Sequence, residues 1–122
     1  MKIKESAENY LECILMLREE CGGVRSIDVA KRMGVTKASV SVAMKSLRAD
    51  GYITVSENGE LHLTDRGKAV AARIYERHQI IAEVLMKLGA SRENAFADSC
   101  KIEHDISDES FQCIKAFLNT SK

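Results

Sequence analysis

The stretch Ser26–Thr64, SIDVAKRMGVTKASVSVAMKSLRADGYITVSENGELHLT, contains the features that decide the fold. Ser26 is a suitable cap for a short helix over 27–33. The inward side of that helix is expected to carry Val29, Ala30 and Met33. Gly34 and Val35 follow, and a glycine at this point predicts a tight turn.

A second helix is predicted directly after this turn, with Thr36 as its cap and an end near Ala49. Its buried face is expected to hold residues at i, i+4 and i+7, namely Val40, Met44 and Leu47. A helix, a glycine-containing turn and a second helix form the helix-turn-helix pattern.

Beyond Gly51 the periodicity changes from helical to alternating. The segments 52–56 and 60–64 both alternate apolar and polar residues, and Asn58-Gly59 between them is a strong two-residue hairpin signal. A hairpin that directly follows a helix-turn-helix is the wing of a winged helix.

Capping residues and glycines predict four further helices. Their expected ranges are about 7–20, 65–88, 92–104 and 108–118, with caps at Ser6, Thr64, Ser91 and Ser107. The predicted fold is therefore mainly α: a winged helix-turn-helix DNA-binding domain over 1–64, made of three helices and a β-hairpin, and a helical metal-binding and dimerisation domain over 65–122. The three helices of the second domain are too few to hide all their apolar faces alone.

Charge and composition narrow the class of protein. The chain has 122 residues, and 18 lysines and arginines balance 18 aspartates and glutamates, so no whole-protein basic attraction to nucleic acid is expected. The sequence has neither an apolar run long enough for a bilayer nor a signal peptide, which predicts a soluble cytoplasmic protein. The absence of CxxC pairs predicts free thiols. Three of these cysteines are expected to pack as small apolar residues: Cys13, Cys21 and Cys113.

A local basic excess lies in the helix-turn-helix. Residues 24–48 hold six lysines and arginines against the single acid Asp28. Phosphates attract such a surface, and short polar side chains suit the major groove. The candidate DNA-binding residues are Arg25, Thr36, Lys37, Ala38, Ser39, Ser41 and Lys45, and Ala38 and Val42 are candidates for contact with a thymine methyl.

Two other interpretations of this segment remain open. The bases could form only a solvated surface, and winged helices also contact proteins. The wing tip, 57–60, is acidic and would repel a DNA backbone, so the prediction depends on the helix.

A second set of residues has the chemistry of metal ligands. Cys100, Glu103 and His104 stand at i, i+3 and i+4, so thiolate, carboxylate and imidazole share one face of a helix. A helical hairpin could bring His78 close, and the first helix offers Glu8, Asn9 and Glu12. The alternative is structural: a buried cysteine, a surface glutamate and a histidine at a helix end, with the acids of the first helix forming a solvated face.

The order of these motifs resembles the diphtheria toxin repressor family of metal-dependent transcriptional regulators. The resemblance is carried by SAENYLECILML at 6–17, ERHQII at 76–81 and CKIEHDIS at 100–107, and it extends to IKAFL at 114–118. The chain looks most like the short, two-domain manganese transport regulator branch, because it ends without the extra SH3-like domain of the longer iron regulators.

This resemblance implies a ligand set, a cofactor and partners. The implied metal ligands are Asn9, Glu12, His78, Cys100, Glu103 and His104. The implied cofactor is a divalent transition metal ion, Fe²⁺ or Mn²⁺, with Zn²⁺, Co²⁺ or Ni²⁺ possible in vitro. The implied partners are a second copy of the chain and a double-stranded, pseudo-palindromic DNA operator, and the implied output is repression of metal-uptake genes.

Three positions depart from the family pattern. The manganese type has Asp at Asn9 and Glu at Cys100, whereas the iron type has Met and Cys. Asn9 offers only a neutral carbonyl, and Cys100 offers either a thiolate or its backbone carbonyl, so the site is softer and shifts from Mn²⁺ toward Fe²⁺. Ala82 stands where the iron branch has a glutamate of its second site.

The hypothesis for regulation is that metal selects one spacing of two recognition helices from a looser ensemble. Two alternatives remain: a metalloenzyme whose open coordination position activates water, and a metal-blind winged-helix regulator whose CxxEH motif is structural.

Overall fold

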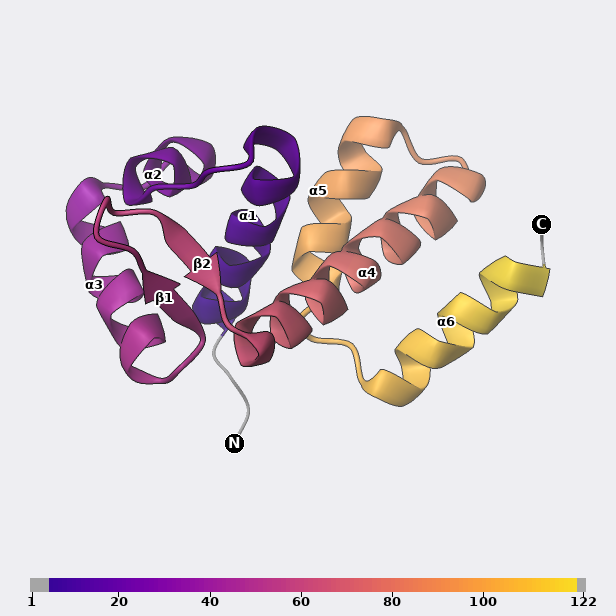
Figure 1. The fold of residues 1–122 in the computed structure, drawn as a ribbon. Helices are drawn as coiled ribbons and strands as arrows, with labels where there is room; N and C mark the ends of the chain where they lie inside the picture. The colour runs from indigo at the N-terminus through magenta and orange to yellow at the C-terminus, as the bar shows by residue number, and fades with distance from the viewer. Residues whose placement is uncertain (1–4, 121–122) are drawn as a thin grey trace. The chain divides into compact units, whose positions relative to one another are not determined.

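The computed structural model describes residues 5–120 and confirms a mainly α fold with one β-hairpin (Figure 1). The elements are α1 (Glu5–Cys21), α2 (Ser26–Met33), α3 (Lys37–Ala49), β1 (Ile53–Val55), β2 (Leu61–Leu63), α4 (Asp65–Lys87), α5 (Arg92–Ile102) and α6 (Asp108–Thr120). The chain forms two compact units that divide within α4, between Ala72 and Arg73. The predicted domain boundary at residue 64 stays a prediction.

The helix-turn-helix forms as predicted in the first unit. Gly34 ends α2 with a φ of 68°, in the left-handed region where glycine has no steric penalty. The Thr36 hydroxyl accepts a hydrogen bond from the Ser39 backbone N–H at 3.1 Å and so caps α3. The predicted face of α3 is buried in a core shared with α1, α2 and the hairpin; it consists of Val40, Met44 and Leu47.

The hairpin has a three-residue loop in place of the predicted two-residue turn. The strands pair antiparallel with Thr54 opposite His62, and the Ser56 backbone N–H donates to the Glu60 carbonyl at 2.9 Å. A two-residue type I′ turn needs positive φ at both central residues, but among residues 5–120 only glycines have positive φ. Gly59, with a φ of 84°, therefore provides the left-handed position alone.

The start of α4 is bound closely to the residues that precede β1. The Thr64 hydroxyl donates to the Gly51 carbonyl at 2.7 Å and accepts from the Gly67 N–H at 3.1 Å, which confirms Thr64 as a cap. Arg66 lies over the Tyr52 ring and donates to the Tyr52 hydroxyl at 3.1 Å. These contacts place the first turns of α4 against the wing.

Three local predictions are wrong. Ser6 lies inside α1, which already includes Glu5, and Ser26 is the first residue of α2. The side chain of Asp28 accepts from the Arg25 N–H at 2.9 Å, which makes Arg25 the residue before the helix.

The cysteines differ in their surroundings. Burial raises the pKa of the Cys13 thiol to about 11, which fits a thiol that packs as a small apolar side chain. Cys21 and Cys113 are exposed, contrary to the prediction, because they lie on the outer sides of α1 and α6.

The second unit consists of the remainder of α4, with α5 and α6 on either side of it in Figure 1. Its core includes Ile74, Ile81, Ala95, Phe111 and Leu118. Ser91 and Ser107 cap α5 and α6 as predicted, each through a hydrogen bond from the N–H three residues later.

Apolar side chains remain exposed on the second unit. Leu88 is 76% exposed and Phe117 is 64% exposed. Within residues 5–120, no helix combines the length and the apolar composition needed to span a membrane.

Candidate metal centre and nucleic-acid surface

The second unit gathers one imidazole, one thiol and one carboxylate. His78 comes from α4, Cys100 from α5, and Glu103 from the residue that follows α5. Their donor atoms all lie within 4.8 Å of one another. The His78 Nδ1 is 2.9 Å from the Glu103 Oε2 and 3.6 Å from the Cys100 Sγ, so the cysteine sulfur faces the cluster.

The cluster forms although α5 is shorter than predicted. The helix ends at Ile102 instead of His104, and the Asp105 N–H donates to the Ile102 carbonyl to tighten the chain. Glu103 keeps a helical backbone, and its N–H donates to the Ser99 carbonyl at 3.0 Å. Its carboxylate therefore still reaches the His78 ring.

His104 lies beside this cluster and is not one of its three members. The His104 Nε2 is 3.4 Å from the other oxygen of Glu103, Oε1, and the His104 side chain is buried. The predicted single helical face for Cys100, Glu103 and His104 is thus wrong in its last position, because the helix has ended.

Two residues of this region were missed by the sequence analysis. Ser99 is fully buried; its hydroxyl is 2.7 Å from the His78 Nδ1 and donates to the His78 carbonyl at 3.0 Å. Arg77 is buried and donates to the carbonyls of Glu103 and Ile106 at 3.1 and 2.9 Å. Neither role has a sequence signature, since both depend on how α4 and α5 pack.

The surroundings of His78 favour a positive charge. Hydrogen bonds to Cys100 and then Glu103 raise the pKa of His78 to about 10, against the opposing effect of burial. Glu103 is fully buried, and its Oε1 has no hydrogen-bond partner within residues 5–120. A buried carboxylate with an unused oxygen requires a cationic neighbour.

The donor set fits a transition metal ion. Atoms bound at about 2.0–2.3 Å to one tetrahedral ion lie roughly 3–4 Å apart, and the separations from the His78 Nδ1 fall close to this range. Nitrogen, sulfur and oxygen donors together suit Fe²⁺, Zn²⁺ and neighbouring ions better than Mg²⁺ or Ca²⁺.

The predicted ligands Asn9 and Glu12 lie on α1, in the first unit. Glu8 and Glu12 are only 2% and 7% exposed, so the alternative of a solvated acidic face on this helix is wrong for these two residues. The assignment of Asn9 and Glu12 as ligands stays a prediction.

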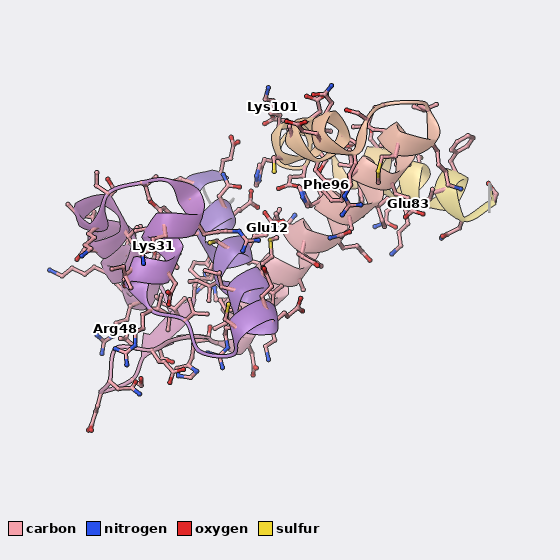
Figure 2. The ribbon with its side chains drawn as sticks, turned by 90° about the horizontal axis from the view of Figure 1, so that it is seen from above. Glu12, Lys31, Arg48, Glu83, Phe96 and Lys101 are labelled. Atoms are coloured by element: carbon pink, nitrogen blue, oxygen red, sulfur yellow. The ribbon has the colours of Figure 1, made fainter. Side chains whose placement is uncertain are left out.

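The outer face of α3 has the features of a nucleic-acid surface. Every predicted DNA-binding residue is exposed: Arg25, Thr36, Lys37, Ala38, Ser39, Ser41 and Lys45. The helix carries three basic residues and no acidic one. Figure 2 labels two further basic side chains of this unit, Lys31 on α2 and Arg48 on α3.

Two of these side chains are engaged with each other. The Thr36 hydroxyl, besides capping α3, donates to the Ser39 hydroxyl at 3.0 Å. We therefore expect Thr36 to orient the start of α3. At the wing tip, Glu57 is exposed and acidic, as the sequence indicated.

A winged helix with a basic outer helix, together with a His/Cys/Glu cluster suited to a transition metal, defines a metal-dependent DNA-binding regulator. Residues 2–61 match the family described as iron dependent repressor, N-terminal DNA binding domain. Residues 64–122 match iron dependent repressor, metal binding and dimerisation domain. The chain belongs to the iron-dependent repressor family, which confirms the resemblance that its motifs carry.

Individual relatives agree with this family. The transcriptional regulator MntR of Salmonella typhimurium is 35% identical over 114 residues, which are 93% of this chain and 73% of the relative. The structure of the manganese regulator SloR aligns with a TM-score of 0.82 at 26% identity, over 98% of this chain and 55% of that one. The metal-dependent transcriptional regulator MtsR aligns with a TM-score of 0.85 at 27% identity, over 93% and 53%. The chain thus spans about half the length of these solved structures.

Proposed function

We propose that a divalent metal ion, Fe²⁺ or Mn²⁺, bound through His78, Cys100 and Glu103 switches on DNA binding by α3. The single observation that supports this most is the convergence of three different metal donors within 4.8 Å in the unit that matches a metal-binding domain. A cluster that was only structural would not need a buried carboxylate oxygen without a hydrogen-bond partner.

Each residue has a distinct task in this proposal. Glu103 supplies the negative charge and is held by its own helical turn, while His78 supplies a nitrogen once its proton has left. Ser99 fixes the orientation of the His78 ring. When bound, the ion supplies the positive charge that the proton on His78 otherwise provides.

The remaining ligands and the metal preference rest on the family resemblance. His104, adjacent to Glu103, together with Asn9 and Glu12 of α1, completes the proposed ligand set. A thiol at Cys100 and a neutral amide at Asn9 make the site softer than an all-carboxylate site, which favours Fe²⁺ over Mn²⁺.

The proposed output is transcriptional repression of metal-uptake genes in the cytoplasm. The exposed apolar side chains Leu88 and Phe117 belong to the unit that matches a dimerisation domain, so we propose a homodimer that binds a pseudo-palindromic operator. Since the relatives are transcriptional regulators, we propose a regulatory role and no catalytic one.

The test removes the buried carboxylate without changing its shape. Glu103→Gln is expected to weaken metal binding at least about tenfold, because even residues outside the ligand set commonly contribute that much. Metal-stimulated binding to DNA, measured by fluorescence anisotropy, should disappear with it. His104→Ala tests the neighbouring position in the same assay.

The matched control is Glu76→Gln, which changes an exposed carboxylate of α4 that pairs with Lys115. This variant should keep the metal response. An undiminished metal response in Glu103→Gln, with a folded dimer verified by light scattering, would reject the proposed site.

A further inference from the structure

Val42 is the most exposed large apolar side chain of the first unit in residues 5–120. It is 70% exposed, whereas Ile27 and Val35 are 38% and 37% exposed. At 100° per residue, Val42 stands about 200° around α3 from the buried Val40. It therefore points away from the core of this unit, and packing within the unit does not explain its apolar character.

The surroundings of Val42 identify the kind of partner. Ala38 lies one turn before it and Lys45 one turn after it, and both are exposed. The whole of α3 carries Lys37, Lys45 and Arg48 and no acid. A methyl-rich centre bordered by lysines is complementary to a groove that has apolar groups on its floor and phosphates at its edges.

The DNA major groove offers such a group only at thymine. Its 5-methyl is the one apolar substituent displayed there, and alanine, threonine and other methyl-bearing side chains contact it. Valine has no hydrogen-bonding group, so it can distinguish bases only through such contact. A polar reader at this position would instead select for a donor or an acceptor.

We propose that Val42 is a specificity-determining residue that packs against a thymine 5-methyl group in each half-site of the operator. This inference rests on the proposed function, because it requires α3 to enter the major groove. It adds a base preference: each half-site should contain a thymine at the position that Val42 reaches.

The test uses duplexes selected from a random library by the metal-loaded full chain. Each thymine is then replaced in turn by 2′-deoxyuridine, which removes the methyl group and keeps base pairing. One contacted thymine should cost about fourfold in affinity, and the symmetric pair about 15-fold, from the area of a buried methyl.

Val42→Ala should bind the thymine duplex about as weakly as the wild type binds the deoxyuridine duplex, and should no longer distinguish the two. Val35→Ala makes the same chemical change in the turn before α3 and should retain full sensitivity to deoxyuridine. This ratio between two duplexes is independent of any change in protein stability.

The outcomes separate the two proposals. If the wild type binds a selected duplex but no thymine is sensitive, or if Val42→Ala remains as sensitive as the wild type, the inference about Val42 is overturned and the proposed function stands. If the metal-loaded wild type binds no DNA, the proposed function fails first and the inference fails with it.

Discussion

His78 shows most clearly how single residues set the behaviour of the cluster. Its Nδ1 is the atom that a metal would need, yet in the metal-free protein this nitrogen is shared among Glu103, Ser99 and Cys100. The same contacts raise the pKa of His78 to about 10 from an ordinary value of 6.5. Proton and metal therefore compete for one lone pair.

This competition predicts a pH dependence of metal binding. Between about pH 6.5 and 10, metal binding must displace the His78 proton, so affinity should rise about tenfold per pH unit. The stability of the metal-free protein should change in the opposite direction. The charged His78 stabilises the fold fully below about pH 6.5, and this contribution is lost as the pH rises through about 10.

Metal titrations at several pH values, and proton release in weakly buffered solution, measure this effect. Cys100→Ser removes the largest cause of the raised pKa and should flatten the dependence. An affinity that stays constant between pH 6.5 and 8.5 would contradict the competition.

Cys100 predicts the choice of metal. Its sulfur lies 3.6 Å from the His78 Nδ1, so a change at this residue alters the donor set directly. Replacing Cys100 with Glu and Asn9 with Asp should shift activation of DNA binding from Fe²⁺ toward Mn²⁺, since hard oxygen donors replace sulfur and a neutral amide.

Cys113→Glu provides the matched control for this prediction, because Cys113 is exposed on α6. The ranking of Mn²⁺, Fe²⁺ and Zn²⁺ in the DNA-binding assay should be the same as in the wild type. An unaltered ranking in the double variant as well would refute the selectivity hypothesis.

Among the elements, α4 determines most of the organisation because both units contain part of it. Its first turns are hydrogen-bonded to residues 51–52. Farther along, Arg77 ties the helix to the chain after α5, through the carbonyls of Glu103 and Ile106 and an ion pair with Asp108. The residue next to His78 thus holds the segment that carries Glu103.

The close approach at the start of α4 predicts the effect of one substitution. A Cβ at Gly67 would lie 2.0 Å from the Tyr52 carbonyl oxygen, which belongs to the backbone and cannot move aside cheaply. Gly67→Ala should therefore destabilise the fold by about 1–3 kcal/mol or more, despite the higher helix propensity of alanine.

Chemical denaturation of this variant beside Lys68→Ala, its exposed neighbour in α4, measures the cost. Lys68→Ala should change the free energy of unfolding by less than about 0.5 kcal/mol. Equal stability of Gly67→Ala and the wild type would show that α4 does not start against Tyr52 as described.

For the molecule as a whole, the distribution of charge matters more than its sum. The net charge is zero, but α3 carries three basic residues and no acid. Affinity for DNA should therefore depend on a few positions of the first unit and decrease steeply with salt.

Lys37→Ala combined with Lys45→Ala is expected to weaken binding to all DNA sequences alike. The slope of log affinity against log salt should fall by about two, one for each lost phosphate contact. Lys87→Ala with Lys101→Ala removes the same charge from exposed positions of α4 and α5 and should leave the slope unchanged (Figure 2 labels Lys101). Identical slopes for the two double variants would mean that another surface binds DNA.

Local chemistry explains which parts of this fold were predictable. The buried face of α3 and the caps Thr36, Thr64, Ser91 and Ser107 follow from neighbours within four residues in the chain, and all of them are confirmed. The prediction failed at Ser26, where the side chain of Asp28 caps the preceding residue. It also failed at Asn58, where the loop adopts a form that requires positive φ at Gly59 alone.

The order of helices, the winged helix and the residue types of a metal cluster were therefore legible in the chain, because periodicity and spacing act over short range. Packing between α4 and α5 settled the rest: that the His78 Nδ1 meets Cys100 and Glu103, that His104 lies outside the three, and that Ser99 and Arg77 support them. Such pairings join residues more than twenty positions apart, and no local pattern encodes a distance between side chains on different helices.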